Sequence, residues 1–206
     1  MKNITKEMYM NNPCGSLPNA FWKSIEYHVP KNITILHERD CGTCPNAMKY
    51  FRLIHHLEKI ASFTHDDFMF ETVNIKTQKG LVSEILSECY NTEYTVDFID
   101  KLIKTRVFDN DLWLLVIEKS TLQPVALGIA DFDSEIKEGS LEWIQVLPSK
   151  RGLGLGKLVV NELLFRLRIK ADFVTVSGQV DNKTNPEMLY RKCGFTGNDI
   201  WYVFHT

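Results

Sequence analysis

The sequence predicts a mixed α/β fold, a largely antiparallel sheet flanked by helices. From about residue 66, strand-like runs and helical segments alternate in the order β-α-α-β-β-β-α-β-α-β. Three of these strands follow one another across short turns, which is typical of hairpins. The next strand lies beyond a helix, which is typical of a βαβ crossover, and together these patterns indicate a mixed sheet.

The bulk properties are those of an ordinary globular chain of 206 residues, with 44% hydrophobic and 24% charged side chains and a net charge of -2. The absence of a basic surplus argues against nucleic-acid binding. No window approaches the ~18 apolar residues of a membrane span, and the first ten residues lack a secretory signal. Five irregularly spaced cysteines are a poor disulfide framework. We therefore expect a cytoplasmic protein without nucleic-acid or membrane partners.

Residues 1–65 are predicted to form an N-terminal extension that precedes the main domain, residues 66–206. Within it we expect a short strand over 32–38 and a helix over 47–60, after Pro45. The C-x-x-C of Cys41 and Cys44 is compatible with a redox pair or half of a zinc site. It lies in an irregular turn without further spaced ligands, so we favour free thiols and expect no metal site.

The first half of the main domain contains two helices between strands. Residues 68–75 alternate as a strand does, and 79–90 and 96–107 have helical patterns. A continuous apolar run over 112–118 predicts a buried strand. Short turns then lead to further strands over 125–133 and 141–147.

The second half begins with the glycine-rich loop SKRGLGLGKL, which precedes a helix predicted over 156–170. A strand follows over 172–180. Pro186 begins a short helix, and Gly194 is well placed as its C-terminal glycine. A last strand is expected over 199–205.

The spacing within this loop excludes two common nucleotide-binding motifs. A P-loop would need glycine at Arg151 and a hydroxyl residue at Leu158. A dinucleotide fingerprint would need glycine at Lys157. Glycines and basic residues at the start of a helix nevertheless favour anion binding, because the first turn offers unpaired N–H groups. A tight connection with solvated basic residues is the alternative.

The loop resembles the acetyl-CoA-binding motif of the GNAT N-acetyltransferases, [RQ]-x-x-G-x-[GA], at Arg151, Gly154 and Gly156. The preceding QVLP and the later LYRKCGF, Leu189 to Phe195, also resemble this family. The resemblance covers about residues 66–206 and implies a sheet splayed around a coenzyme A site. It implies cofactor binding by Val146, Leu147, Arg151, Gly152, Leu153, Gly154, Leu155, Gly156 and Lys157.

The asparagine-bearing loop departs from the family pattern. Lys183 and Pro186 occupy the positions where the family often has asparagine and alanine. Asn182 and Asn185 flank the expected place, and we include both as candidate cofactor-binding residues.

The resemblance implies that Tyr190 is the general acid that protonates the departing thiolate. Glu142 roughly matches the family's general base, and strand alternation would place it on the side of Ile144 and Val146. Asp131, Asp133 and an ordered water remain alternatives for the base. Without the resemblance, the two residues would be interpreted as a packed helix tyrosine and an exposed outer-face glutamate.

The resemblance thus implies an acetyl-CoA-dependent N-acetyltransferase that transfers directly to a primary amine. The alternative is a non-catalytic acyl-CoA-binding or sensing module. The acceptor is expected to be a small-molecule amine or a peptide. We expect residues 1–65 to pack beside the sheet and to shape either the acceptor pocket or a homodimer contact.

Overall fold

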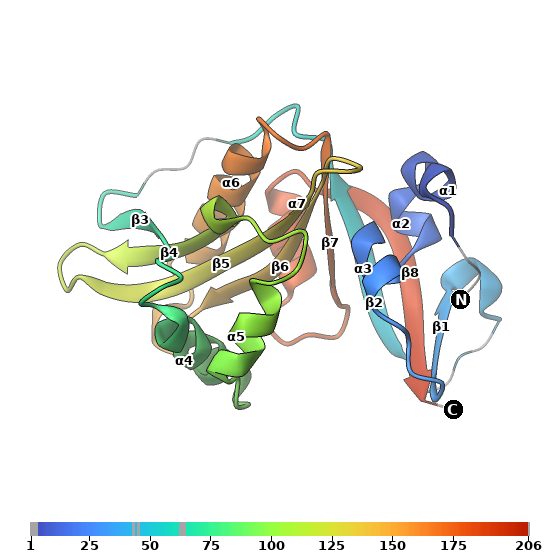
Figure 1. The fold of residues 1–206 in the computed structure, drawn as a ribbon, viewed down its shortest axis with the longest axis horizontal. Helices are drawn as coiled ribbons and strands as arrows, with labels where there is room; N and C mark the ends of the chain where they lie inside the picture. The colour runs from blue at the N-terminus through green and yellow to red at the C-terminus, as the bar shows by residue number, and fades with distance from the viewer. Residues whose placement is uncertain (1–3, 43, 45, 62–64, 206) are drawn as a thin grey trace.

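The computed structural model describes residues 4–42, 44, 46–61 and 65–205. Within these residues, eight strands form one sheet in the order β1-β8-β2-β7-β6-β5-β4-β3 (Figure 1). The predicted mixed α/β fold is confirmed. The strands are β1 (Ile33–His37), β2 (Met48–His55), β3 (Phe68–Thr72), β4 (Trp113–Glu118), β5 (Gln123–Asp133), β6 (Glu138–Val146), β7 (Phe173–Gln179) and β8 (Thr196–His205).

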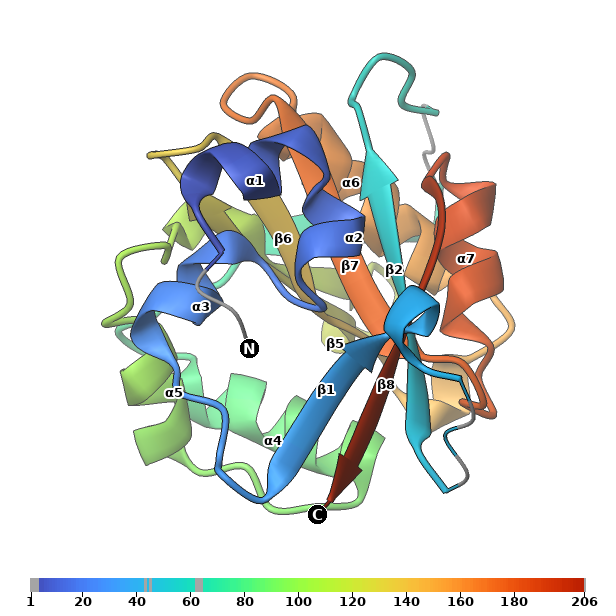
Figure 2. The same ribbon diagram turned by 90° about the vertical axis from the view of Figure 1, so that its right-hand side faces the viewer.

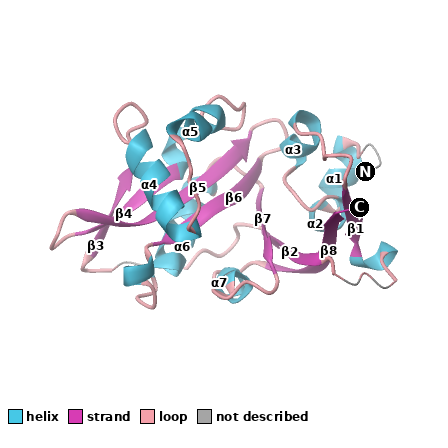
Figure 3. Cartoon of the chain, turned by 90° about the horizontal axis from the view of Figure 1, so that it is seen from below, coloured by secondary structure: helices cyan, strands magenta, loops and turns pink. Residues whose placement is uncertain are grey.

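Helices cover both faces of this sheet. α4 and α5 lie on one side and α7 on the other (Figure 3). The α-helices are α1 (Lys6–Asn11), α2 (Pro13–Ser16), α3 (Phe21–Glu26), α4 (Lys79–Tyr90), α5 (Val96–Leu102), α6 (Leu155–Leu167) and α7 (Pro186–Lys192). Three short 3-10 helices are η1 (Glu38–Asp40), η2 (Asn110–Leu112) and η3 (Pro148–Lys150).

Two apolar cores lie on opposite faces of the sheet. One face packs against α6, whose Leu158, Val159 and Leu163 are buried together with Tyr190. The other packs against α4 and α5, through residues such as Leu86. Apolar residues of β4 alternate between the two cores, which is why its sequence is a continuous apolar run.

The sheet opens between β6 and β7, which are the parallel pair among the described strands. Their pairing runs only from Glu138 opposite Phe173 to Leu141 opposite Val176. β6 continues to Val146 and pairs there with β5 alone. The second half of β6 therefore has a free edge, which is the splay that the family resemblance implied.

The helix predicted over 47–60 is wrong, because residues 48–55 form strand β2. β2 lies between β7 and β8 and runs antiparallel to both. Phe51, Arg52 and Leu53 are buried in succession, so this strand lacks the alternation that marks a half-exposed strand. A second helix is shorter than predicted, since α5 ends at Leu102.

The N-terminal segment both joins the sheet and covers part of it. β1 forms an edge beside β8, and α1 to α3 gather on one side of β1, β8 and β2, with α7 on the other (Figure 2). Tyr9, Leu17 and Phe21 pack against Ile136 and Phe173. Residues 33–55 therefore share a sheet with residues 68–205, and the predicted boundary near residue 65 falls between strands of that sheet.

A buried polar network fixes this segment to the strands. The Tyr9 hydroxyl donates to Glu138 Oε1 at 2.5 Å, and the Phe21 amide donates to Glu138 Oε2 at 3.0 Å. Arg52 Nη2 lies 3.3 Å from Glu138 Oε1, and both side chains are almost fully buried. Thr175 Oγ1 also donates to Glu138, at 2.5 Å. One carboxylate thus connects α1, α3, β2 and β7.

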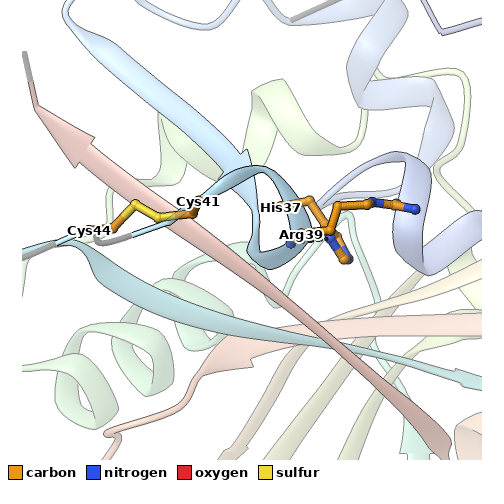
Figure 4. Close-up of a disulfide and its surroundings, with 4 residues drawn as sticks. All are labelled: His37, Arg39, Cys41 and Cys44. Carbon is orange, nitrogen blue, oxygen red and sulfur yellow. Dashed lines mark hydrogen bonds between the residues drawn. A yellow bond between two sulfur atoms is a disulfide. The ribbon is translucent and has the colours of Figure 1, made fainter.

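Cys41 and Cys44 form a disulfide beside η1 (Figure 4). The free thiols predicted for this pair are therefore wrong. His37 and Arg39 lie on the same turn, where the Arg39 amide donates to His37 Nδ1 at 3.2 Å. Cys14, Cys89 and Cys193 are free. Pro45, which was expected to precede a helix, lies outside the described residues.

Candidate active site

The glycine-rich loop connects β6 to α6 through η3. Gly152 and Gly154 have left-handed backbones, with φ of 87° and 78°. A Cβ at Gly152 would meet no atom within 4 Å, so this glycine is required by its backbone angle, not by crowding. Gly154 is the N-cap of α6 and provides no side-chain cap. The first-turn N–H groups of α6 therefore remain available to an anion.

Gly156 has a different role from the other two glycines. A Cβ there would lie 3.0 Å from Leu189 Cδ2 on α7. Its small size therefore allows α6 and α7 to approach closely. Because α7 carries Tyr190, this contact sets the position of the tyrosine relative to the loop.

The free edge of β6 presents backbone groups beside the loop. The Leu147 amide donates to the Val125 carbonyl at 3.0 Å, within the β5–β6 ladder. In an antiparallel pair the neighbouring residue points the other way, so the N–H and C=O of Val146 face the gap. Arg151 Nε donates to the Val146 carbonyl at 3.2 Å. The Val146 N–H is thus the backbone donor at this edge, whereas the Leu147 N–H is occupied.

Tyr190 lies on α7, which packs against α6 and β7, and it is 7% exposed. Its ring packs against Phe51 and Phe195, with centroids 6.1 and 5.7 Å away. Within the described part of the chain its hydroxyl has no hydrogen-bond partner. Burial, followed by the neighbouring groups Tyr90, Cys193 and Glu142, raises the pKa of Tyr190. The phenol therefore remains protonated at neutral pH.

Glu142 occupies a β-bulge where the sheet opens. Ile129 pairs with Trp143 and Ala130 with Leu141, which leaves Glu142 as the extra residue. The simple alternation expected along this strand therefore does not hold at Glu142. Its Oε2 accepts a hydrogen bond from Lys23 Nζ at 2.5 Å, and Ser140 Oγ donates to Oε1 at 2.8 Å. The Glu142 side chain is only 11% exposed.

The two aspartates on β5 have different surroundings. Asp133 is held by Arg106 through two hydrogen bonds of 2.6 and 2.8 Å. Asp131 lines a cavity together with Glu142 and Lys23. Burial, and then the charge of Glu142, raise the pKa of Asp131 well above its usual value. Of these two aspartates, Asp131 is therefore the one that lines the cavity beside Glu142.

Several known proteins are similar to this chain in sequence or in fold. A family model described as FR47-like protein matches residues 131–202. The ribosomal protein bS18 alanine N-acetyltransferase of Haemophilus influenzae is 29% identical over 117 residues, 57% of this chain and 77% of that protein. A GCN5-related N-acetyltransferase from Sphaerobacter thermophilus superposes with a TM-score of 0.66 at 16% identity, over 76% of this chain and 50% of that one.

The ribosomal-protein-S18-alanine N-acetyltransferase from Escherichia coli has a TM-score of 0.53 at 14% identity, covering 66% of this chain and 90% of that one. In sequence and in fold, the chain is therefore similar to N-acetyltransferases of the GNAT superfamily. It spans about half the length of the Sphaerobacter structure. Because these relatives are N-acetyltransferases, we take the glycine loop, the free edge of β6 and Tyr190 as the candidate active site of this chain.

The two candidate asparagines already have local backbone partners. Asn182 Oδ1 accepts from the amide and the hydroxyl of Thr184, at 2.9 and 2.7 Å. Asn185 is the N-cap of α7, and its side chain accepts from the Met188 amide at 3.4 Å. Both oxygens thus stabilise the loop before α7. Cofactor contact by either residue stays a prediction.

The sequence patterns did not identify Lys23 or the cavity beside it. Lys23 reaches Glu142 across 119 residues of sequence, and α3 has no motif that predicts this contact. A cavity of about 820 Å³ lies between α3, α5 and β1, and a smaller one of about 360 Å³ shares Lys23 and Glu142 as lining residues. Size alone makes the larger cavity suited to a small-molecule ligand.

Two further observations concern membranes and metal ions. Across residues 4–42, 44, 46–61 and 65–205, no helix is both long and apolar enough to span a membrane. The same stretch contains no group of three or more His, Cys, Asp or Glu side chains placed to hold a metal ion.

Proposed function

We propose that this chain is an acetyl-CoA-dependent N-acetyltransferase that transfers an acetyl group directly to a primary amine. One observation carries the proposal. The sheet opens between β6 and β7, α6 begins just after the β6 strand, and α7, which carries Tyr190, packs against α6 and β7. This arrangement supports the proposal, because it brings a helix N-terminus, a free strand edge and the helix of a candidate proton donor to one part of the sheet.

The residues around the gap fit coenzyme A. Gly152 and Gly154 have positive φ angles, and a Cβ added at Gly152 would meet no atom within 4 Å, so a ligand could approach the loop backbone and its N–H groups there. A pyrophosphate would accept hydrogen bonds from these groups and would be favoured by the helix dipole. The free edge of β6, which begins beyond Leu141, would pair with the amide-containing pantetheine arm, as an added strand pairs with a sheet edge.

The side chains supply the proton transfers that amide formation needs. Glu142 accepts a proton from the bound ammonium, directly or through water, so that the neutral nitrogen can attack the thioester carbonyl. The Val146 N–H stabilises the oxyanion that develops. A C–N bond forms, the C–S bond breaks, and the Tyr190 hydroxyl protonates the departing thiolate.

Calorimetry with acetyl-CoA and an assay of thiol release with a panel of amines test the proposal together. Tyr190→Phe removes a hydroxyl without a protein partner, so the fold and the affinity for acetyl-CoA should persist. The rate of thiol release should fall about 10²-fold or more, the usual contribution of a general acid. Tyr202→Phe, on β8 beside Lys49, is the matched control and should retain the parent rate.

The alternative function makes the opposite prediction for the same variant. A non-catalytic acyl-CoA-binding module would bind acetyl-CoA but release no thiol with any amine. Tyr190→Phe would then change nothing measurable. A protein that binds neither acetyl-CoA nor coenzyme A would overturn both functions.

A further inference from the structure

The larger cavity has walls that are mostly apolar. α3 and the segment after it contribute Trp22 and Tyr27. Phe98 of α5 and Trp143 of β6 face the cavity from the other side. Trp143 and Phe98 pack edge to face, with centroids 5.9 Å apart. Four aromatic side chains thus surround a volume of about 820 Å³, which suits an apolar body of small-molecule size.

Among the described residues, the cavity is lined by three charged side chains, Asp131, Glu142 and Lys23, and by one histidine, His28. Lys23 contacts Glu142 directly, at 2.5 Å. Asp131 has no such contact with a cation in the described part of the chain. The cavity therefore contains two carboxylates but one ammonium group.

A second cation would complete this charge balance. Asp131 is half-buried and has no cationic partner in the described part of the chain, and its desolvation and the nearby charge of Glu142 raise its pKa. The ammonium group of a bound amine would supply the missing charge beside Asp131. It would also lie next to Glu142, the residue proposed to remove its proton.

From this arrangement, and on the basis of the proposed function, we infer that the acceptor is a small-molecule monoamine with a bulky apolar body, preferably aromatic. Its ammonium group lies beside Asp131 and Glu142, and its body lies among Trp22, Phe98 and Trp143. Phosphorylated amino sugars are disfavoured, because the lining residues contain no basic group apart from Lys23 and His28. Polyamines are disfavoured because a second ammonium would have no further carboxylate.

Binding without acetyl-CoA tests this inference separately from the enzymatic function. Calorimetry would compare 2-phenylethylamine with spermidine, glucosamine 6-phosphate, a short peptide with a free N-terminus, and the uncharged analogue 2-phenylethanol. We expect 2-phenylethylamine to bind at least about tenfold more tightly than each of the others, as one charge-assisted contact beside an apolar site provides. Equal or tighter binding of any other compound would overturn the inference.

Thiol release measured in parallel distinguishes the two failures. If 2-phenylethylamine binds selectively but no amine supports thiol release, the proposed function fails and the inferred ligand class stands. If spermidine or the peptide supports thiol release more efficiently than 2-phenylethylamine, the function stands and the inferred acceptor class is wrong.

A variant of the cavity wall provides a second test. Ile25 lines the cavity and is 54% exposed, so Ile25→Asp should fold and add a third carboxylate to the cavity wall. We expect spermidine to bind at least about tenfold more tightly and 2-phenylethylamine to bind more weakly. Ile169→Asp, at an 82% exposed isoleucine outside the cavity, should leave both affinities unchanged. Identical affinities in Ile25→Asp and the parent would contradict the inferred position of the amine body.

Discussion

Neutralising one partner of the buried ion pair between Arg52 and Glu138 should strongly destabilise this protein. Glu138→Gln keeps the shape of the side chain but leaves the Arg52 guanidinium, 1% exposed, without its countercharge. The Arg52 Nε atom already has no hydrogen-bond partner. The amide NH₂ introduced by the substitution would also point either at the Phe21 amide or at Tyr9 and Thr175, all of which now donate to the Glu138 carboxylate.

The expected loss follows from this burial. Removing one partner of a buried ion pair costs about 3–5 kcal/mol of the free energy of unfolding. A chain of this length loses about 2–4 °C of Tm per kcal/mol, so the Tm should fall by about 6–20 °C. Thermal unfolding followed by circular dichroism measures this shift. Hydrogen exchange of the Phe21 amide should also accelerate, because its acceptor is altered.

Two further variants isolate the cause. Glu135→Gln removes a 56% exposed carboxylate that pairs with Lys6, and such surface pairs contribute at most about 1 kcal/mol. Arg52→Met combined with Glu138→Gln removes the orphaned cation, so it should recover most of the lost Tm. A Glu138→Gln shift no larger than that of Glu135→Gln would refute the assigned importance of the network.

Two other substitutions probe the active site. Because the pKa of Asp131 is raised on folding, its contribution to stability is full below the unfolded pKa of about 3.9 and is lost as pH rises through the folded pKa. Asp131→Asn should therefore raise the Tm at neutral pH but not in acid, and a lower Tm at neutral pH would contradict the assignment. Gly152→Ala places a side chain on a residue whose φ is 87°, which should lower the free energy of unfolding by about 1–2 kcal/mol. It should also weaken acetyl-CoA binding. Denaturant unfolding measures the first effect and calorimetry the second. Gly80→Ala, equally uncrowded but inside α4, should instead stabilise by about 0.5–1 kcal/mol, and similar effects at both glycines would exclude strain as the cause.

Local patterns were enough to predict much of this fold and part of the site. The hairpins β4–β5–β6, the crossover through α6, and the loop ahead of it are encoded by neighbouring residues, and the structure confirms these elements. The spacing of Arg151, Gly154 and Gly156 indicated the GNAT resemblance for the same reason. The positive φ of Gly154 and the close contact of Leu189 at Gly156 then gave that spacing a physical basis.

Long-range contacts explain what the sequence could not predict. The sequence of β2 taken alone resembles that of a helix, because the partners that bury Arg52 lie up to 125 residues away along the chain. Likewise, α3 has no motif, yet its Lys23 contacts the proposed base. The bulge at Glu142 depends on the register between β5 and β6, which no periodicity within β6 alone reveals.

The two glutamates of β6 show how one strand serves both stability and chemistry. Glu138 lies where β6 still pairs with β7, so its carboxylate is enclosed and every partner is supplied by the protein. Glu142 lies just past Leu141, where that pairing ends, and its carboxylate faces two cavities beside Lys23. The same N-terminal segment contacts both, through Tyr9 and Phe21 at one and Lys23 at the other. The network around Glu138 therefore positions the helix that forms one wall of the proposed acceptor site, so that loosening this network should disturb acceptor binding before it disturbs the coenzyme A loop.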